Sequence, residues 1–203
     1  MARAETVRRI YERAAAKYDS SGIGHVVDTM RGRVLRDAVG DVLELGVGAG
    51  ATFQFYPHAV RRLTGLDVSR AMLDRARSLA VGLRFPVDLV EVDFQTLSFR
   101  DSAFDTVVCS LALCGIPDPP CLFGEIRRVL RPGGRLLAIE HVRPRFPGLG
   151  LVADLSVPIT ERLVGCAFNR RTPEMARAAG FKVRELEHRL LGTFVSFVAT
   201  PPR

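Results

Sequence analysis

The chain has 203 residues, of which 47% are hydrophobic, so it can bury one substantial core and a single domain is expected. No segment is apolar for long enough to span a bilayer, and residues 1–12 are too charged for a signal peptide, which favours a cytoplasmic protein. The net charge of +7 comes from arginines spread along the whole chain, without a basic run interleaved with aromatic residues, so we expect no nucleic-acid partner.

The chain begins with two predicted helices. Apolar side chains recur at helical spacing between residues 4 and 18. This first helix either only caps the sheet or closes over a ligand site together with its neighbours, through Tyr11, Tyr18 and His25. A second helix is expected at about residues 26–39 and leads to the first strand.

A glycine-rich turn follows a short buried strand predicted at residues 41–45. Gly46, Gly48 and Gly50 allow backbone conformations that a Cβ would forbid, and they leave room for a ligand to lie against the main chain. Glu44 places a carboxylate just before the turn. The pattern predicts a site for a nucleotide-like ligand where this strand ends.

The next strand, predicted at residues 63–67, ends in a second carboxylate, Asp67. An acid at this position commonly binds a pair of ribose hydroxyls. Before this strand, Thr52 begins a predicted helix whose free N–H groups face the ligand end of the sheet. After it, Ser69 is the expected N-cap of an amphipathic helix in which Met72 either belongs to the core or contacts the ligand.

Three more strands complete the parallel part of the predicted sheet. An alternating run at residues 87–92 leads to Asp93. Residues 106–109 and 136–139 are continuously apolar, which is typical of parallel strands covered on both faces. The helix between them is closed by Arg-Pro-Gly-Gly at residues 131–134. This alternation of strands and helices predicts a doubly wound sheet with its ligand beyond the carboxyl ends of the strands.

The last third of the chain changes character. Residues 146–168 are apolar and punctuated by proline and glycine, which favours a substrate lid. A short helix is expected from Thr172, as a candidate N-cap, to Gly180. Residues 181–188 and 193–200 are predicted to form a terminal hairpin. The predicted fold class is therefore α/β, a doubly wound, Rossmann-like, seven-stranded and mostly parallel sheet with an antiparallel carboxy-terminal hairpin strand.

We expect this single domain to comprise four parts. They are a helical cap at residues 1–40, a ligand-binding core at 41–142, a substrate lid at 143–171, and a carboxy-terminal helix and hairpin at 172–203.

The four cysteines, Cys109, Cys114, Cys121 and Cys166, form no C-x-x-C pair and have no histidine at metal-ligand spacing. We therefore expect neither a zinc site nor a disulfide, but buried thiols in a reducing compartment.

Residues 44–50, Glu-Leu-Gly-Val-Gly-Ala-Gly, resemble the glycine-rich motif of the class I S-adenosylmethionine (SAM) methyltransferases. Phe104-Asp105, the Arg-Pro-Gly-Gly segment and the closing hairpin extend this resemblance over nearly the whole chain. It implies SAM as the cofactor, with Asp93 accepting a hydrogen bond from the adenine amino group and Phe94 flanking the ring. The implied cofactor site comprises Tyr11, Tyr18, Glu44, Gly46, Gly48, Gly50, Thr52, Asp67, Val68, Met72, Asp93, Phe94 and Cys109.

Within this superfamily, residues 43–57 and 107–114 are most similar to the animal membrane-associated alkyl-thiol methyltransferases. That branch implies a small or medium-sized apolar acceptor, with a thiol favoured because a thiol of pKa about 8.5 supplies thiolate without a strong base. Residues 11–19 instead resemble the amino-terminal signature of quinone-biosynthesis and phospholipid methyltransferases, which leaves C- or N-methylation open. We expect no stable membrane insertion and leave peripheral membrane contact open.

Three side chains are candidates for orienting or deprotonating the acceptor: His141, His25 and, in the lid, Asp154. Two readings from other classes stay open. With Ala51 as a third small residue, the glycine turn also satisfies the relaxed dinucleotide fingerprint of an NAD-dependent oxidoreductase. A SAM-binding module without catalytic activity fits the same residues, and the sequence leaves the oligomeric state open.

Overall fold

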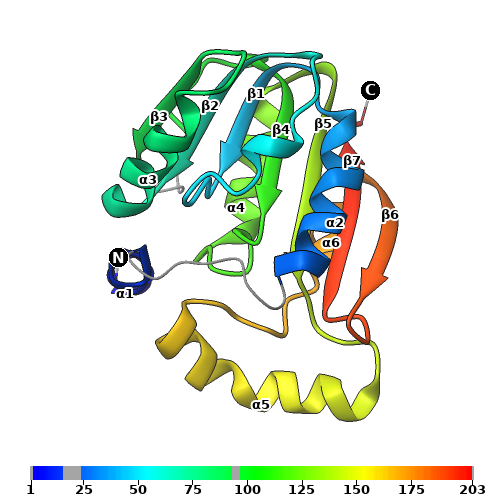
Figure 1. Ribbon diagram of the computed structural model, residues 1–203. Coiled ribbons are helices and arrows are strands. Elements are labelled where there is room, and N and C mark those ends of the chain that lie inside the picture. Colours follow the sequence, from blue (N-terminus) through cyan, green and yellow to red (C-terminus); the bar gives the residue numbers. More distant parts are fainter. Residues whose placement is uncertain (1, 16–23, 93–96, 203) are drawn as a thin grey trace.

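A seven-stranded sheet with the strand order β3-β2-β1-β4-β5-β7-β6 forms the centre of the molecule (Figure 1). The computed structural model describes residues 2–15, 24–92 and 97–202. The strands are β1 (Gly40–Leu45), β2 (Val60–Asp67), β3 (Val87–Glu91), β4 (Phe104–Ser110), β5 (Leu130–His141), β6 (Lys182–Arg189) and β7 (Phe194–Thr200). The α-helices are α1 (Ala2–Ala14), α2 (Gly24–Val34), α3 (Arg70–Ala80), α4 (Pro119–Val129), α5 (Pro147–Val164) and α6 (Thr172–Ala178), and the short 3-10 helices are η2 (Leu35–Asp37) and η3 (Phe53–Phe55).

The predicted fold class is confirmed by the strand pairing. Strands β1 to β5 pair in parallel, and β7 then pairs antiparallel to both β5 and β6. In the β5–β7 register, His141 lies opposite Phe194. Because parallel strands point the same way, Leu45, Asp67 and Ser110 end at one edge of the sheet together with His141.

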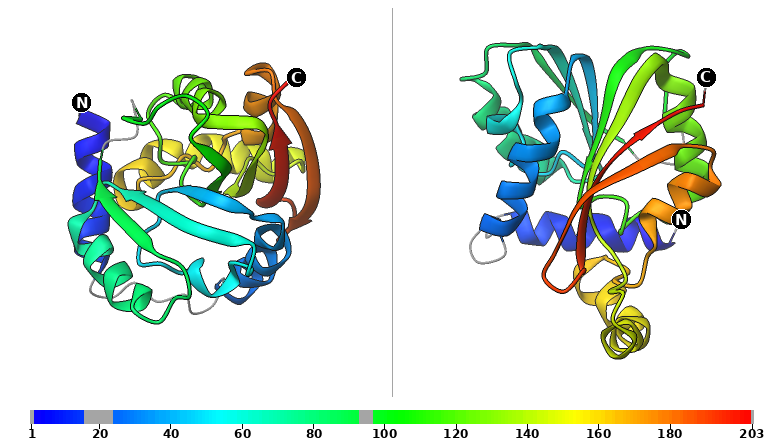
Figure 2. Two further views of the ribbon diagram at one scale, coloured as in Figure 1. Left: turned by 90° about the horizontal axis from the view of Figure 1, so that it is seen from above. Right: turned by 90° about the vertical axis from the view of Figure 1, so that its right-hand side faces the viewer.

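Helices cover both faces of this sheet (Figure 2). Helices α2 and α3 lie on one face, where their apolar side chains share a core cluster with Val108 and Leu137. Helices α4 and α6 lie on the other face, in a cluster with Val107 and Leu136. Adjacent residues of β4 and β5 therefore belong to opposite cores, which is the reason that these strands are apolar at every position.

The helix boundaries follow local chemistry. The Ser69 hydroxyl accepts a hydrogen bond from the Met72 N–H at 3.2 Å, so the predicted N-cap of α3 is confirmed. Asp118 caps α4 in the same way, because its carboxylate accepts from the Cys121 N–H. The expected cap of α6 is wrong: Arg171 occupies that position and Thr172 is the first helical residue.

Several elements differ from the sequence-based expectations. The second helix ends at Val34 and continues only as a 3-10 turn, and the helix expected after the glycine turn is the single 3-10 turn η3. Within the segment expected as a lid, Pro147–Val164 form one 18-residue helix, α5, which continues through Pro158. Residues 131–134 are part of the long strand β5.

The carboxyl edge of the sheet faces two helices that cover neither of its faces. Figure 1 shows the arrowheads of the parallel strands pointing toward α1 and α5. The second view in Figure 2 places the same two helices beyond that edge. They contact each other, so the loops after β1, β2, β4 and β5 lie between the sheet and this pair of helices.

Candidate active site

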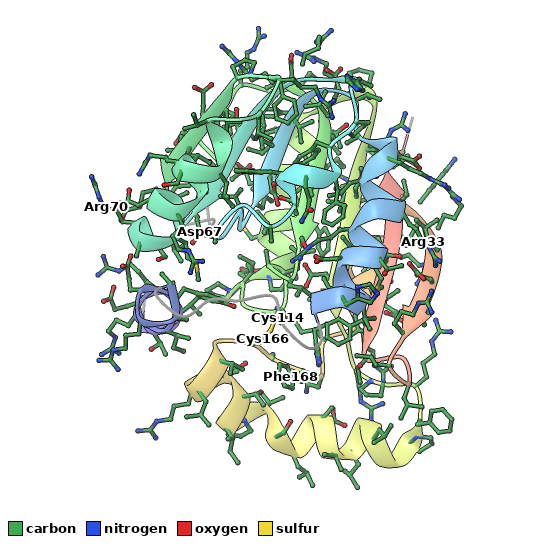
Figure 3. The ribbon with its side chains drawn as sticks, in the orientation of Figure 1. Arg33, Asp67, Arg70, Cys114, Cys166 and Phe168 are labelled. Atoms are coloured by element: carbon green, nitrogen blue, oxygen red, sulfur yellow. A yellow bond between two sulfur atoms is a disulfide. The ribbon has the colours of Figure 1, made fainter. Side chains whose placement is uncertain are left out.

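A cavity of about 420 Å³ lies at the carboxyl edge of the sheet. Its volume is within the range of about 300–1,000 Å³ that is typical of small-molecule sites. Its walls come from the loops after β1, β2 and β4, from the end of β5, from α1 and the start of α3, from the end of α5 and the segment after it, and from the start of β7. Figure 3 shows Asp67 near one end of this region and Cys114, Cys166 and Phe168 between the sheet and α5.

The glycine turn forms part of the cavity wall with its backbone. Gly46 and Gly48 both line the cavity, at φ +71° and φ +54°. A Cβ on Gly46 would lie 2.5 Å from the Cβ of Ala112, whereas a Cβ on Gly48 would meet nothing within 4 Å. The turn therefore requires glycine at position 46 for close approach to the next loop and keeps space open at position 48. Gly50 packs against Phe53 and does not line the cavity.

Asp67 lines the cavity at the end of β2 and fixes the glycine turn. Its two carboxylate oxygens accept the N–H of Gly48 at 2.8 Å and the N–H of Ser69 at 2.9 Å. Burial raises the pKa of this carboxyl, while the backbone donors oppose the rise. A carboxylate has about four acceptor sites, so these two bonds leave capacity for a hydroxyl pair of a ligand.

Glu44 and Thr52 lie behind the glycine turn and do not line the cavity. The Glu44 carboxylate is fully buried, and one of its oxygens accepts both the Thr52 hydroxyl at 2.9 Å and the Tyr56 hydroxyl at 2.8 Å. Burial raises the Glu44 pKa to about 7. The structure therefore assigns these residues to the support of the turn, because neither side chain reaches the cavity.

Other residues expected at the cofactor site are placed in different ways. Tyr11, Val68 and Met72 line the cavity, and Met72 is also packed in a small core cluster. Cys109 is fully buried in the main core and does not line the cavity, because its side chain belongs to the face covered by α4 and α6. Tyr18, Asp93 and Phe94 lie outside the described residues.

His141 lines the cavity at the end of β5. Its ring lies between Phe168, with centroids 4.1 Å apart, and Phe194, with centroids 4.9 Å apart. Burial lowers the pKa of the imidazole to about 4, so it is neutral at pH 7. Its buried Nδ1 has no hydrogen-bond partner among the residues that the structure describes. The ring is therefore placed to make a polar contact with a ligand in an otherwise aromatic and aliphatic environment.

The two other expected acceptor-side residues lie away from the cavity lining. His25 is exposed in the first turn of α2. Asp154 is held by Arg143, whose guanidinium donates to both carboxylate oxygens at 2.9 to 3.1 Å. That hydrogen-bonded pair lowers the Asp154 pKa and joins α5 to the segment after β5. Asp154 therefore serves an ion pair here, and the geometry does not place it as a base.

Glu140 is a site residue that the sequence analysis did not single out. Its fully buried carboxylate accepts the N–H groups of Ala112 at 3.1 Å, Leu113 at 2.9 Å and Cys114 at 3.3 Å. Burial raises its pKa to about 8, against the opposing effect of these donors. The bonds fix the loop after β4, in which Leu111 adopts φ +59° and lines the cavity. The signal in the sequence was an acidic residue that directly follows the apolar run at residues 136–139 and precedes His141.

The expectation that all cysteines are thiols is wrong. Cys114 and Cys166 form a disulfide that spans a sequence separation of 52 and lines the cavity. It joins the loop after β4 to the segment after α5. Cys109 and Cys121 remain outside the disulfide. Among residues 2–15, 24–92 and 97–202, no group of three or more candidate side chains is placed to hold a metal ion.

Comparison with known proteins gives the family. Residues 43–138 match the model of the methyltransferase domain. A phosphatidylethanolamine N-methyltransferase from Cereibacter sphaeroides is 37% identical over 142 residues, which is 68% of this chain and 68% of that protein. The chain belongs to the methyltransferase domain family. The thiol S-methyltransferase TMT1B of Homo sapiens is 32% identical over 151 residues. The matched region is 72% of this methyltransferase and 62% of that relative.

A solved structure agrees with the family at the level of the fold. The DhpI–SAM–HEP complex has a TM-score of 0.73 with 20% sequence identity and covers 97% of this methyltransferase and 97% of its own chain. The protein is a SAM-dependent methyltransferase, and its family uses SAM as the cofactor. The alternative of an NAD-dependent oxidoreductase is therefore set aside.

The residues of the cavity fit this cofactor. Backbone at Gly46 and Gly48 leaves space that a side chain would fill, and Asp67 supplies a carboxylate at the adjacent strand end. These three residues would hold the nucleoside part of SAM, with Val68 and Met72 as apolar contacts.

Proposed function

We propose that this enzyme transfers a methyl group from SAM to a small or medium-sized apolar acceptor, with a thiol favoured. The observation that carries the proposal is the environment of His141. Phe168 and Phe194 flank its neutral ring, and Leu163 and Val164 add aliphatic surface to the same cavity. The backbone of Gly46 and Gly48 and the side chain of Asp67 line the cavity at the ends of β1 and β2, whereas His141 lies at the end of β5. SAM and the methyl acceptor would therefore occupy different ends of one cavity.

The low pKa of His141 favours a thiol over a hydroxyl acceptor. A base with a pKa of about 4 removes a proton poorly from an alcohol. A thiol has a pKa of about 8.5 in water, so part of it is already thiolate near neutral pH. A neutral imidazole that only orients the thiol is therefore sufficient. His141 therefore acts as a positioning group that hydrogen-bonds to the acceptor sulfur, while the thiol proton passes to water before the methyl group is transferred.

The remaining residues exclude water and fix the geometry. Bound SAM supplies a methyl group that its sulfonium already activates. Tyr11 of α1 and Phe168 narrow the cavity from the side opposite the sheet, which removes water from the reacting groups. Glu140 holds the loop after β4, and that loop lies against Gly46. Asp67 and Glu140 thus keep the two halves of the cavity in register.

A second candidate is N-methylation of a phospholipid headgroup. It is favoured by the relative from Cereibacter sphaeroides, whose name states that activity. The amino-terminal resemblance to quinone-biosynthesis enzymes supports a third acceptor class, methylation of a quinone carbon. Both need an acceptor with a long apolar part, which the mainly aliphatic and aromatic cavity wall also accommodates.

The experiment that separates these candidates uses SAM with a labelled methyl group and four reactions in parallel. These contain an alkyl thiol, a demethylquinone, phosphatidylethanolamine in vesicles, or no acceptor. We expect labelled thioether from the first, with a lower kcat for His141→Phe than for the control variant Leu79→Ala on the exposed end of α3. Label in the phospholipid or quinone alone would replace the thiol by that acceptor. SAM binding without label in any product would identify a module that binds the cofactor without catalysis.

A further inference from the structure

The outer side of α5 carries most of the large hydrophobic side chains that the described residues leave exposed. Eight of the fourteen exposed large hydrophobic residues lie between Phe146 and Val164. The most exposed are Leu155 at 71%, Leu163 at 68%, Val152 at 63% and Ile159 at 62%. Only Gly150 and Ala153 of this helix are buried.

These exposed side chains form one continuous stripe. Val152, Leu155, Ile159 and Leu163 are separated by three or four residues, so they lie on one side of a helix with about 3.6 residues per turn. At about 100° per residue, the buried Gly150 lies opposite this stripe and the buried Ala153 lies roughly 115° from its centre. Figure 3 shows the side chains of α5 extending away from the sheet. We call these four residues the α5 stripe.

The α5 stripe is suited to a partner that covers apolar surface. Burial of an apolar side chain is favourable in water, so four of them in one row favour a partner that covers them. Contiguous apolar patches of this kind mark interaction surfaces in natural proteins. The inner side of α5 already contacts α1 and the Arg143 ion pair, so the partner binds from outside.

The charge around the stripe selects the kind of partner. Residues 143–171 contain five arginines and two acids, and the whole chain carries a net charge of +7. Three arginines of this region are exposed: Arg162 on α5, and Arg9 and Arg13 on α1, which contacts α5. An apolar stripe within a basic region is complementary to the surface of an anionic bilayer, which attracts arginine side chains. A second copy of this chain would bring the same positive charge against it.

We propose that α5 is a docking helix that lies in the surface of an anionic lipid membrane. None of the helices in the described part of the chain is long and apolar enough to cross a membrane, so α5 lies along the surface. Leu163 and Val164 are both exposed and part of the cavity wall. An apolar acceptor dissolved in the membrane thus reaches the cavity along the end of this helix.

The test is co-sedimentation of the full chain with vesicles, without SAM or an acceptor. Vesicles of phosphatidylcholine alone are compared with vesicles that contain phosphatidylglycerol, at low and high salt. We expect binding to the anionic vesicles that weakens with salt. The double variant Leu155→Glu/Ile159→Glu should bind at least tenfold more weakly, whereas Leu79→Glu/Val81→Glu, an exposed apolar pair at the end of α3, should bind like the wild type.

Each other outcome contradicts the proposal. No vesicle binding by the wild type, or equal binding by both double variants, would overturn it. Sedimentation that shows a dimer disrupted only by the α5 variant, without vesicle binding, would assign the stripe to a second copy of the chain. Circular dichroism and melting temperatures show whether each variant is folded. Because all four substituted residues are exposed, we expect both variants to fold. Because no methyl transfer is measured, failure here leaves the proposed acceptor unaffected.

Discussion

The imidazole ring of His141 lies 4.1 Å from the ring of Phe168, centroid to centroid, at an interplanar angle of 36°. This contact joins the end of β5 to the segment after α5 and places a neutral polar group inside an apolar wall. It connects the electrostatics of the site with the stability of the fold, because the same burial that lowers the His141 pKa also makes protonation destabilising.

The first prediction concerns the pH dependence of stability. The pKa of His141 falls from 6.5 to about 4 on folding, so the unfolded chain binds the proton more readily. The folded state is favoured by the neutral ring above pH 6.5, and this advantage is lost as the pH falls toward 4. The fall corresponds to roughly 3 kcal/mol. In urea unfolding at several pH values, the free energy of unfolding should decrease more steeply below pH 6.5 for the wild type than for His141→Phe. Parallel curves would contradict the assignment.

The second prediction concerns the carboxylate at the end of β2. Asp67→Ala removes the acceptor for two backbone N–H groups and the expected ribose contact. Loss of such charged hydrogen bonds at about 1.5–3 kcal/mol each predicts SAM affinity at least tenfold lower by isothermal titration. Asp88→Ala removes an exposed carboxylate from the neighbouring strand β3 and serves as the control. Unimpaired SAM binding by Asp67→Ala would remove the ribose assignment.

The third prediction compares two glycines of the same turn. Both have positive φ, so alanine at either position introduces backbone strain of about 1–2 kcal/mol. Gly46→Ala adds a contact of 2.5 Å with Ala112 and should be the less stable variant by a further 1–3 kcal/mol or so. Gly48→Ala has free space in the structure and should mainly reduce SAM affinity, because its methyl group enters the cavity. Thermal melts and titration of both variants test this ranking, and equal stability would contradict it.

The fourth prediction uses the buried Glu44. Its pKa is raised from 4.5 to about 7, so folding favours the protonated carboxyl, and this stabilisation is fully present below pH 4.5 and lost as the pH rises through 7. The stability of the wild type relative to Glu44→Gln should therefore decrease between pH 4.5 and pH 8. Glu44→Leu leaves the hydroxyls of Thr52 and Tyr56 without their acceptor and should be destabilised by about 1–3 kcal/mol per hydroxyl at every pH. Chemical unfolding at pH 4.5 and pH 8 distinguishes the pH-dependent effect of the carboxyl from the pH-independent loss of its hydrogen bonds.

The fifth prediction concerns the disulfide. Closing a loop with a sequence separation of 52 stabilises the folded chain by about 4 kcal/mol in the chain-entropy model. Addition of a reductant, or the Cys114→Ala/Cys166→Ala variant, should lower the melting temperature, whereas Cys121→Ser should not. Thiol labelling without reductant should modify the exposed Cys121 rapidly and the buried Cys109 only after unfolding. Four thiols in the unreduced, unfolded protein would contradict the pairing.

Local sequence patterns determined much of the fold. The Ser69 cap, the apolar strands β4 and β5, and the closing hairpin were predicted because each depends on neighbouring residues. The placement of Asp67 at the cavity also followed, since strand ends of a parallel sheet share one edge. The continuation of α5 through Pro158 was missed, because proline and glycine oppose a helix locally while tertiary contacts support it.

The features that the sequence did not reveal depend on contacts between distant segments. The pairing of Cys114 with Cys166 needs the end of α5 to return to the loop after β4. The three bonds accepted by Glu140 come from residues 26 to 28 positions away. Glu44 carried the right chemistry, but only the fold shows that its side chain points to Tyr56 rather than to the cavity.

The order of residues at the end of β5 has an evolutionary consequence. Glu140 fixes the loop that touches Gly46, while His141 beside it faces the cavity. In the function proposed above, a substitution at position 141 would change the side chain that meets the acceptor and would leave the contacts of Asp67 and Gly48 unchanged. On that proposal, related enzymes with this fold could change their acceptor through single substitutions at the end of β5 while they keep the site for SAM.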